Sequence, residues 1–419
     1  MPRRLPARRV RTAPLLVLVL LLAGCASSTG GGGSHATTPT GSAAPAFLLT
    51  DLGVGGPEPV IREAGDGSLV VAAQDPEGGG PRVWASHDRG ASFSVSRVNA
   101  QGGGEVDLAA GPGTLYVTQL GTTGNVVSVS RDGGQTWQTS PVGSAQYYFD
   151  REWAGVDDAG RAYLVSRVQG NTQVSQASRS DDNGLTFLPQ GNAWDAQHEP
   201  GLTNGNLVAW NGGIAMPYVC RDGNGVCVAT TRDKGATWTQ ALVRAGNAPV
   251  NNMYAALAAT DAGLLVAWSE AVDGRLAVFD STSADGRSWS APVRVSSTGE
   301  SALEPWPAAR GGTAWIVYVS APAALASGDA PGADHARWTP MAARVDARGA
   351  AQGAPRALSG AVHVGPVSPP VGAGGGAQRD RLLGDFFTAL VDARGKLVVA
   401  VESDPGPQGP SHDVVLREP

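Results

Sequence analysis

Acidic side chains recur along this 419-residue chain, each placed just before an apolar run. They are Glu58, Glu105, Glu152 (after Arg151), Glu199 (after His198), Glu304 and Asp385. If the fold gathers these carboxylates in a confined space, they cannot all ionise without compensation. Some must then pair with Arg, bind a cation or keep their protons. The pattern therefore indicates a polar ligand site, provided that these positions meet.

The arginines that could compensate these acids are Arg62, Arg151, Arg221, Arg275, Arg379 and Arg381. A cation such as Ca²⁺ in the acidic ring is the alternative; apart from it, no metal site or cofactor is indicated. A plainer interpretation is that the acids are solvated or hold loop backbones. On the first interpretation, the predicted ligand-binding residues are Glu58, Glu105, Arg151, Glu152, His198, Glu304, Arg381 and Asp385.

Each acid precedes a pair of apolar runs separated by a Gly or Asp-Gly turn, which is typical of two inner strands of a propeller blade. The pairs are 59–61 with 68–72, 106–108 with 114–117, 153–156 with 162–165, 206–210 with 214–218, 254–257 with 264–268, 307–309 with 314–318, and 387–391 with 396–401. Ligand sites of propellers usually lie where the innermost strands begin. We therefore predict an all-β, seven-bladed β-propeller whose axial channel opens among the acids, with six blades as the alternative.

A second repeat supports the same fold. The stretch from Ser130 to Trp137 reads Ser-x-Asp-x-Gly-x-Thr-Trp, and copies begin at Ser86, Ser180 and Thr231. A fifth copy, at 282–289, is degenerate because its Asp285 comes one place late. In such a turn the Asp carboxylate accepts backbone N–H groups, and Gly adopts the positive φ that a side chain resists. The aromatic residue is expected to pack beneath the hairpin.

This turn resembles the Asp-box, or BNR, repeat of sialidases and other Asp-box propellers. The resemblance covers nearly all of residues 46–419 and implies a propeller whose repeated Asp residues hold turns and do not catalyse. Six blades remain the alternative because sialidases have six.

The resemblance also suggests catalytic residues. Sialidases bind the sialate carboxylate with three Arg and use a Tyr nucleophile activated by Glu, with an Asp as acid/base. Glu199-Pro200 resembles the motif that carries the activating Glu, and Arg221 and Arg275 resemble the second and third Arg of the clamp. The acid/base would be Asp75 or Glu77.

Other positions depart from the sialidase pattern. Pro57-Glu58-Pro59 stands where the first clamp Arg is expected. Trp306 and Phe386 occupy the positions at which the nucleophilic Tyr is sought, and Tyr254 lies one repeat too early. Without a hydroxyl nucleophile and a full clamp, retaining sialidase chemistry is not expected.

The N-terminus is predicted to be a targeting segment. Residues 1–24 combine five Arg with a short apolar run, and Leu22-Ala23-Gly24-Cys25 looks like a lipobox. Cys25 would carry the lipid, and residues 25–45 would form a flexible tether. The expected location is the cell envelope membrane, facing the periplasm or the outside. An ordinary secretory peptide is the alternative.

The remaining two cysteines are consistent with export. Cys220 and Cys227 bracket a Gly-rich turn and are predicted to form a disulfide, with two buried thiols as the alternative. Two loop-like insertions, at 321–336 and 359–380, are expected between repeats six and seven. Residues 46–50 are expected to complete the last blade by pairing with 413–416.

The net charge of −6 argues against nucleic acid as a partner. The function expected is binding of a glycan, or of an envelope protein, at the channel mouth by a monomeric, lipid-anchored propeller. Two alternatives stay open: a divergent glycoside hydrolase using Glu199 with Asp75 or Asp385, and an assembly scaffold for envelope proteins. Whether the chain is an enzyme is left open.

Overall fold

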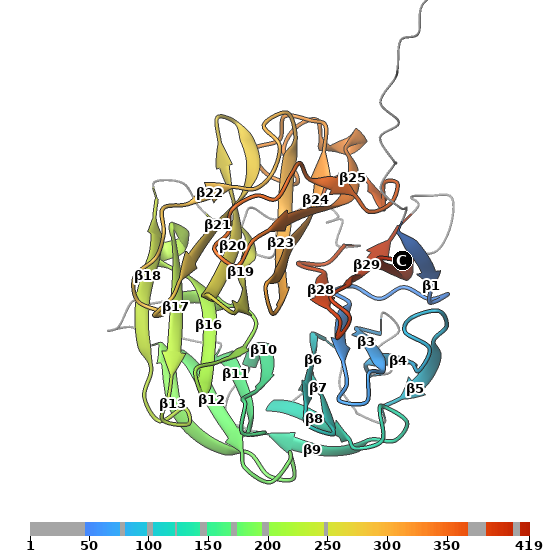
Figure 1. Ribbon diagram of the computed structural model, residues 1–419, viewed down its shortest axis with the longest axis vertical. Coiled ribbons are helices and arrows are strands. Elements are labelled where there is room, and N and C mark those ends of the chain that lie inside the picture. The colour runs from blue at the N-terminus through green and yellow to red at the C-terminus, as the bar shows by residue number, and fades with distance from the viewer. Residues whose placement is uncertain are drawn as a thin grey trace, which may run out of the picture. The chain divides into compact units, whose positions relative to one another are not determined.

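The computed structural model describes residues 47–75, 80–98, 104–121, 124–142, 149–168, 174–194, 201–246, 250–367, 383–404 and 411–419. Side chains are described for these residues apart from 97, 202, 222 and 250–254. All of them belong to the larger of two compact units, Pro45–Pro419. This unit is a seven-bladed β-propeller of antiparallel sheets (Figure 1), as the seven apolar pairs predict.

The first four blades follow one another along the chain. Blade one contains β2 (Val60–Glu63), β3 (Leu69–Ala73), β4 (Arg82–Ser86) and β5 (Ser94–Arg97). Blade two contains β6 (Val106–Gly111), β7 (Thr114–Gly121), β8 (Gly124–Ser130) and β9 (Gln138–Val142). Blade three contains β10 (Phe149–Val156), β11 (Ala162–Val168), β12 (Val174–Ser180) and β13 (Leu188–Trp194). Blade four contains β14 (Gly201–Asn204), β15 (Val208–Trp210), β16 (Gly213–Cys220), β17 (Gly225–Thr231) and β18 (Thr239–Ala245), with the short 3-10 helix η1 (Arg221–Gly223) between β16 and β17.

The other three blades complete the ring. Blade five contains β19 (Val250–Thr260), β20 (Gly263–Val272), β21 (Arg275–Ser283) and β22 (Val293–Arg294). Blade six contains β23 (Ser301–Arg310), β24 (Thr313–Ala321), β25 (Arg337–Val345), β26 (Arg356–Ala357) and β27 (His363–Val364), with the 3-10 helix η2 (Ala333–His335). Blade seven contains β28 (Thr388–Val391), β29 (Leu397–Ser403), β30 (His412–Arg417) and β1 (Leu48–Asp51).

Blade seven closes the ring with strands from both ends of the described chain. Strand β1 pairs antiparallel with β30, in the register Leu49 to Leu416, so the prediction that residues 46–50 complete this blade is confirmed (Figure 1). On the inner side, Thr388 of β28 links the last blade to the first. Its Oγ1 accepts a hydrogen bond from the N–H of Ile61 at 2.8 Å and donates to the Pro59 carbonyl at 3.2 Å. Closure of this kind removes the open edges of a sheet array.

The hydrophobic core lies between neighbouring blades because each sheet is covered on both faces. All eight residues of β16 are buried, for example, and one cluster joins Trp210 and Val228 of blade four to Leu257 and Trp268 of blade five. A strand in a sheet that is buried on both faces has a nearly continuous run of apolar residues in its sequence. This is why the inner strands could be recognised in the sequence.

The repeated Asp turns have the expected hydrogen bonds. Asp132 accepts hydrogen bonds from the Ser130 hydroxyl at 2.8 Å, the Thr136 N–H at 2.9 Å and the Thr136 hydroxyl at 2.6 Å. Burial is the largest single effect and acts to raise the pKa of Asp132, but the hydrogen bonds together outweigh it and lower the pKa to about 2. The fifth copy forms the same turn one residue shorter, because Ser283 opens it and Asp285 accepts from Ser288 N–H at 2.7 Å. Asp285 is therefore in place, which corrects the expectation of a late Asp.

The insertion at 321–336 corrects a second expectation. It lies inside blade six, between β24 and β25, and not between blades six and seven. Its side chains Leu325 and Ala333 are buried, and the Leu276 N–H of blade five donates to the Leu325 carbonyl at 2.7 Å. The insertion is thus an ordered loop that links two blades. Of the second insertion, residues 368–380 lie outside the described residues.

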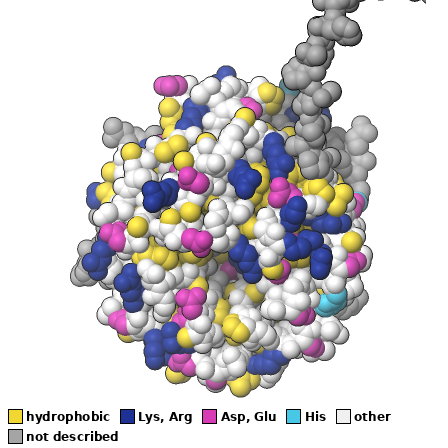
Figure 2. All heavy atoms as spheres, viewed as in Figure 1, with side chains coloured by type: hydrophobic (Ala, Val, Ile, Leu, Met, Phe, Trp, Pro, Cys, Tyr) yellow, Lys and Arg dark blue, Asp and Glu magenta, His cyan; other side chains and the backbone are white. Residues whose placement is uncertain are grey.

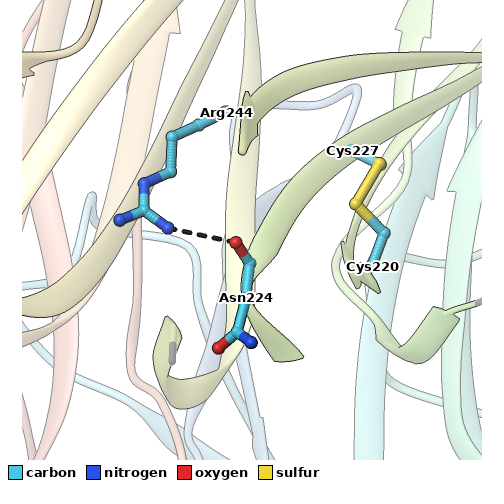
Figure 3. Close-up of a disulfide and its surroundings, with 4 residues drawn as sticks. All are labelled: Cys220, Asn224, Cys227 and Arg244. Carbon is cyan, nitrogen blue, oxygen red and sulfur yellow. Dashed lines mark hydrogen bonds between the residues drawn. A yellow bond between two sulfur atoms is a disulfide. The ribbon is translucent and has the colours of Figure 1, made fainter. Parts of the chain in front are cut away.

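Cys220 and Cys227 form the expected disulfide across the β16–β17 hairpin (Figure 3). The same hairpin is joined to β18, where Arg244 Nη1 donates to the Asn224 carbonyl at 3.2 Å. Arg244 also forms an ion pair with Glu270 of blade five. Covalent and polar links therefore fix the tip of this hairpin.

The surface view shows acidic and basic side chains interspersed with apolar and other side chains on the face that is drawn (Figure 2). In the described part of the chain, no helix has the length and apolar character needed to cross a bilayer.

Candidate ligand site at the channel mouth

The acids that precede the innermost strands meet around one arginine. Glu58 precedes β2, Glu105 precedes β6 and Asp385 precedes β28, and all three form ion pairs with Arg151 of β10. We call this end of the axial channel, with Glu58, Glu105, Arg151, Glu152, Glu304 and Asp385, the channel mouth. Glu304 of β23 holds the corresponding position in blade six and is buried.

Arg151 is enclosed by carboxylates on every polar edge. Its Nη1 and Nη2 donate to the two oxygens of Glu58 at 2.9 and 3.0 Å, and its Nε lies 2.9 Å from Glu105. Nη2 also donates to Asp385. The backbone N–H of Arg151 donates to the other oxygen of Glu105 at 2.7 Å. Charge-assisted pairs of this kind hold a guanidinium in one orientation.

The backbone at the mouth adopts a conformation that non-glycine residues avoid. Glu58, Arg151 and Glu304 have φ values of 64°, 53° and 55°, and Gly384 has 71° at the same place in blade seven. Strand pairing shifts register beside Arg151 and beside Glu304, which marks a bulge in both strands. Each non-glycine residue costs about 1–3 kcal/mol here, and strain of this kind gathers at functional sites. A Cβ at Gly384 would lie 2.4 Å from Cγ of Glu58, so glycine leaves room for the cluster.

Two carboxyl groups of the mouth have raised pKa values. Burial, opposed by Arg151 and reinforced by Glu58, raises the pKa of Glu105 to about 8. Burial, followed by the charge of Glu105, raises the pKa of Glu152 well above its ordinary value. Glu152 is 2% exposed, and neither of its oxygens has a hydrogen-bond partner in the described part of the chain.

Arg151 itself stays charged. Burial disfavours the charged guanidinium, but the carboxylates of Glu105, Glu58 and Asp385 together raise the pKa of Arg151 well above its ordinary value. The mouth thus combines one permanent cation, Arg151, with buried acids that pair with it or have a raised pKa. Among the described residues, no three His, Cys, Asp or Glu side chains are arranged to hold a metal ion.

Three aromatic rings form a floor beneath the mouth. Trp153, Trp306 and Phe386 lie two residues after the strained positions, and their ring centroids are 5.0 to 5.8 Å apart. The Arg151 guanidinium carbon lies 5.4 Å from the centre of the Phe386 ring, within the range of a cation–π contact. We call these three rings the aromatic floor. The rings at positions 306 and 386 carry no hydroxyl nucleophile.

The other suggested catalytic residues lie in separate environments. Asp75 pairs with Arg82, whose Nη2 is 2.9 Å from the Asp75 carboxylate. Arg275 donates to the carbonyls of Ala323 at 2.8 Å and Gly299 at 3.3 Å. Arg221 is exposed in the turn between β16 and β17. No ion pair joins these three residues to the channel mouth within the described residues.

Several predicted residues cannot be placed. Cys25, Glu77, His198, Glu199, Arg379 and Arg381 lie outside the described residues, and of Tyr254 only the backbone, in β19, is described.

One buried acid was not singled out from the sequence. Asp107 of β6 is 1% exposed, and its Oδ2 accepts a hydrogen bond from the Ala154 N–H of blade three at 2.8 Å. Burial, opposed by the charge of Arg62 at 3.5 Å, raises the pKa of Asp107 to about 6. Its position between Val106 and Leu108 was the available signal, because a lone carboxylate rarely interrupts a buried strand without a partner.

Comparison with known proteins bears on the fold. No family model matches the chain, and no curated protein matches it. A solved protein of unknown function from Dyadobacter fermentans is 14% identical, with 88% of this chain and 98% of that chain covered and a TM-score of 0.50. A fungal alcohol oxidase of the AA5 family, in complex with copper, is 13% identical over 89% of this chain and 76% of its own, with a TM-score of 0.56.

Sialidases are also among the solved structures that resemble this chain. The Hadza microbial sialidase Hz136 is 16% identical, with 62% of this chain and 63% of that chain covered and a TM-score of 0.46. At these identities, the similarity concerns the propeller fold alone.

Proposed function

We propose that this protein is an exported, lipid-anchored propeller that binds a glycan at the channel mouth and does not carry out the retaining sialidase reaction. The observation that carries the proposal is the state of Arg151, because three carboxylates already occupy this central guanidinium.

The occupied guanidinium argues against recognition of sialate. A sialidase clamp needs Arg side chains whose donors face the substrate carboxylate. At this mouth an anionic sugar would have to displace Glu58 or Asp385 from Arg151, and both side chains are buried. Of the two clamp candidates suggested by the sequence, Arg275 donates to backbone carbonyls and Arg221 is exposed in the turn between β16 and β17.

The surplus of acceptors favours a ligand that donates hydrogen bonds. In its described part the mouth gathers five carboxyl groups around one arginine, Arg151, so oxygen atoms outnumber cationic N–H donors there; the acids are Glu58, Glu105, Glu152, Glu304 and Asp385. Sugar hydroxyl or ammonium groups are the complementary donors. Glu105, whose side chain is 18% exposed, is the carboxyl group that such a ligand would reach first.

The hydrolase alternative has less support. It requires a second carboxylate beside Glu199, and its candidates Asp75 and Asp385 are paired with Arg82 and Arg151. The membrane anchor through Cys25 remains part of the proposal on the strength of the lipobox-like sequence.

The test combines a hydrolysis assay with a glycan array, using the full-length chain purified in detergent. We expect no release of fluorophore from a sialoside, and binding to glycans that lack carboxylates. Glu105→Gln should weaken that binding at least fivefold, whereas Asp273→Asn, which alters an exposed carboxylate in the β20–β21 turn, should leave it unchanged. Sialoside turnover that disappears in both Glu199→Gln and Arg221→Ala would overturn the proposal. Binding of an envelope protein, with no binding of any glycan, would contradict the proposal that the ligand is a glycan.

A further inference from the structure

The axial channel holds a second hollow, at the end opposite the channel mouth. It has a volume of about 340 Å³ and is lined by later residues of the innermost strands of all seven blades. The aromatic floor adjoins this hollow, because Trp306 belongs both to the floor and to the lining. We call it the axial pocket. Its volume lies at the small end of the range for small-molecule sites, about 300–1000 Å³.

Small apolar side chains keep the axial pocket open. Alanine lines it from six different blades, at Ala109, Ala154, Ala209, Ala258, Ala308 and Ala389. These methyl groups leave the centre of the ring unfilled, whereas longer side chains would meet there. The other side chains of the wall are mainly Val, Leu, Pro and Trp, which offer contacts to an apolar group beside the polar atoms of the lining.

The polar groups in the lining are Arg62, Glu63 and Asn206, and two of them are satisfied. Glu63 pairs with Arg310 and accepts a hydrogen bond from the Ala393 N–H at 3.2 Å. Asn206 donates to the Leu257 carbonyl and accepts from the Leu257 N–H, both at 2.8 Å. Neither side chain requires a ligand.

Arg62 differs, because most of its donors are unused. A guanidinium has five N–H donors. Within the described part of the chain, one donates to the Ile61 carbonyl at 2.9 Å, and Nη2 faces Asp107 at 3.5 Å. The side chain is 20% exposed toward the pocket that it lines. Burial, opposed in part by Asp107, lowers the pKa of Arg62, so this positive charge is incompletely compensated.

From these observations we propose that the axial pocket binds a small molecule in which an apolar body carries one carboxylate. The carboxylate pairs with the unused donors of Arg62, in the bidentate manner that suits a guanidinium. The apolar body lies against the alanine wall. Asp107 acts as a positioning residue: the Ala154 N–H holds it, and it orients Arg62 from behind.

This site is independent of the function proposed for the channel mouth, because its lining contains none of the residues that define the mouth. The two ligands also differ in chemistry: the axial pocket takes an anionic carboxylate, whereas the channel mouth takes a ligand that donates hydrogen bonds. Failure of one proposal therefore leaves the other standing.

The test uses octanoate and its uncharged analogue octanamide, titrated into the full-length protein by isothermal calorimetry. We expect octanoate to bind and octanamide to bind at least tenfold more weakly. This comparison needs no variant, so it holds even if a substitution disturbs folding. Equal affinity for both compounds, or no octanoate binding up to millimolar concentration, would overturn the proposal.

Two variants locate the site. Arg62→Met removes the charge and Ala308→Leu fills the pocket while keeping the charge, so each should weaken octanoate binding at least tenfold. Arg394→Met is the matched control, because Arg394 is 41% exposed and pairs with Asp392 in the turn that follows β28. If both Arg62→Met and Ala308→Leu bind octanoate with wild-type affinity, octanoate binds elsewhere, and the proposal that it binds in the axial pocket is wrong.

Discussion

Removal of the central guanidinium should destabilise the propeller strongly, and more so at high pH. In Arg151→Met, the carboxylates of Glu58, Glu105 and Asp385 keep their places around a side chain without charge. Those of Glu58 and Asp385 are 2% exposed. Breaking a buried ion pair by removal of one partner costs about 3–5 kcal/mol. Since whole domains have unfolding free energies of roughly 5–15 kcal/mol, this loss is a large part of the total.

The pH dependence follows from the same geometry. Without Arg151, the clustered carboxyl groups retain protons in the folded state that they lose in the unfolded state. Stability then falls as pH rises, by about 1.4 kcal/mol per pH unit for each additional proton held. We therefore expect a loss of about 3–5 kcal/mol at pH 8 and a clearly smaller loss at pH 5.

Urea unfolding followed by tryptophan fluorescence, with the disulfide intact, measures both effects. Arg394→Met serves as the control, because an exposed pair of this kind is worth about 1 kcal/mol or less. A loss in Arg151→Met no larger than that of the control at pH 8 would refute the reasoning. So would a loss of the same size at both pH values.

Three further predictions concern single groups. Because the pKa of Glu105 is raised to about 8, the folded state keeps a proton that the unfolded state loses, and stability declines as pH rises from about 4.5 to 8. In urea titrations, Glu105→Gln should make this decline shallower by up to about 1 kcal/mol per pH unit. Asp132→Ala removes the hydrogen bonds of one Asp turn and should cost about 1–2 kcal/mol at pH 7, with less difference from wild type near pH 2, where Asp132 loses its charge. Replacing Cys220 and Cys227 by Ser should cost roughly 2–3 kcal/mol, and dithiothreitol should then have no further effect on the unfolding midpoint.

Much of the fold was predictable because its signals are local. Inner strands are covered on both faces, so each appears as an apolar run followed by a turn. The Asp turns are also local, since Asp132 binds residues no more than four positions away. The pairing of residues 46–50 with 413–416 was predictable for a different reason: the last blade lacked a strand, and a closed ring must supply one.

The errors arose where a local signal was weak. Blade six has no copy of the Asp turn to mark its outer strands, and residues 321–336 were placed between repeats six and seven, whereas they lie between β24 and β25. The other Asp turns have one residue between Asp and Gly, whereas Asp285 and Gly286 are adjacent. This difference hid the alignment of the fifth copy with the repeat, although the hydrogen bonds of the turn are kept.

The sequence by itself determined which residues begin the innermost strands, and hence that the acids gather at one end of the channel. Only the tertiary structure decided how they are compensated. Arg151 pairs with Glu58 and Asp385, which lie 93 and 234 positions away in the sequence. The position of an acid along a strand can be recognised from neighbouring residues. Which of the six candidate arginines pairs with the acids depends on which side chain the closed ring of blades brings to the axis. For the same reason, the unused donors of Arg62 became visible only in the structure, once all seven strand ends enclosed one pocket.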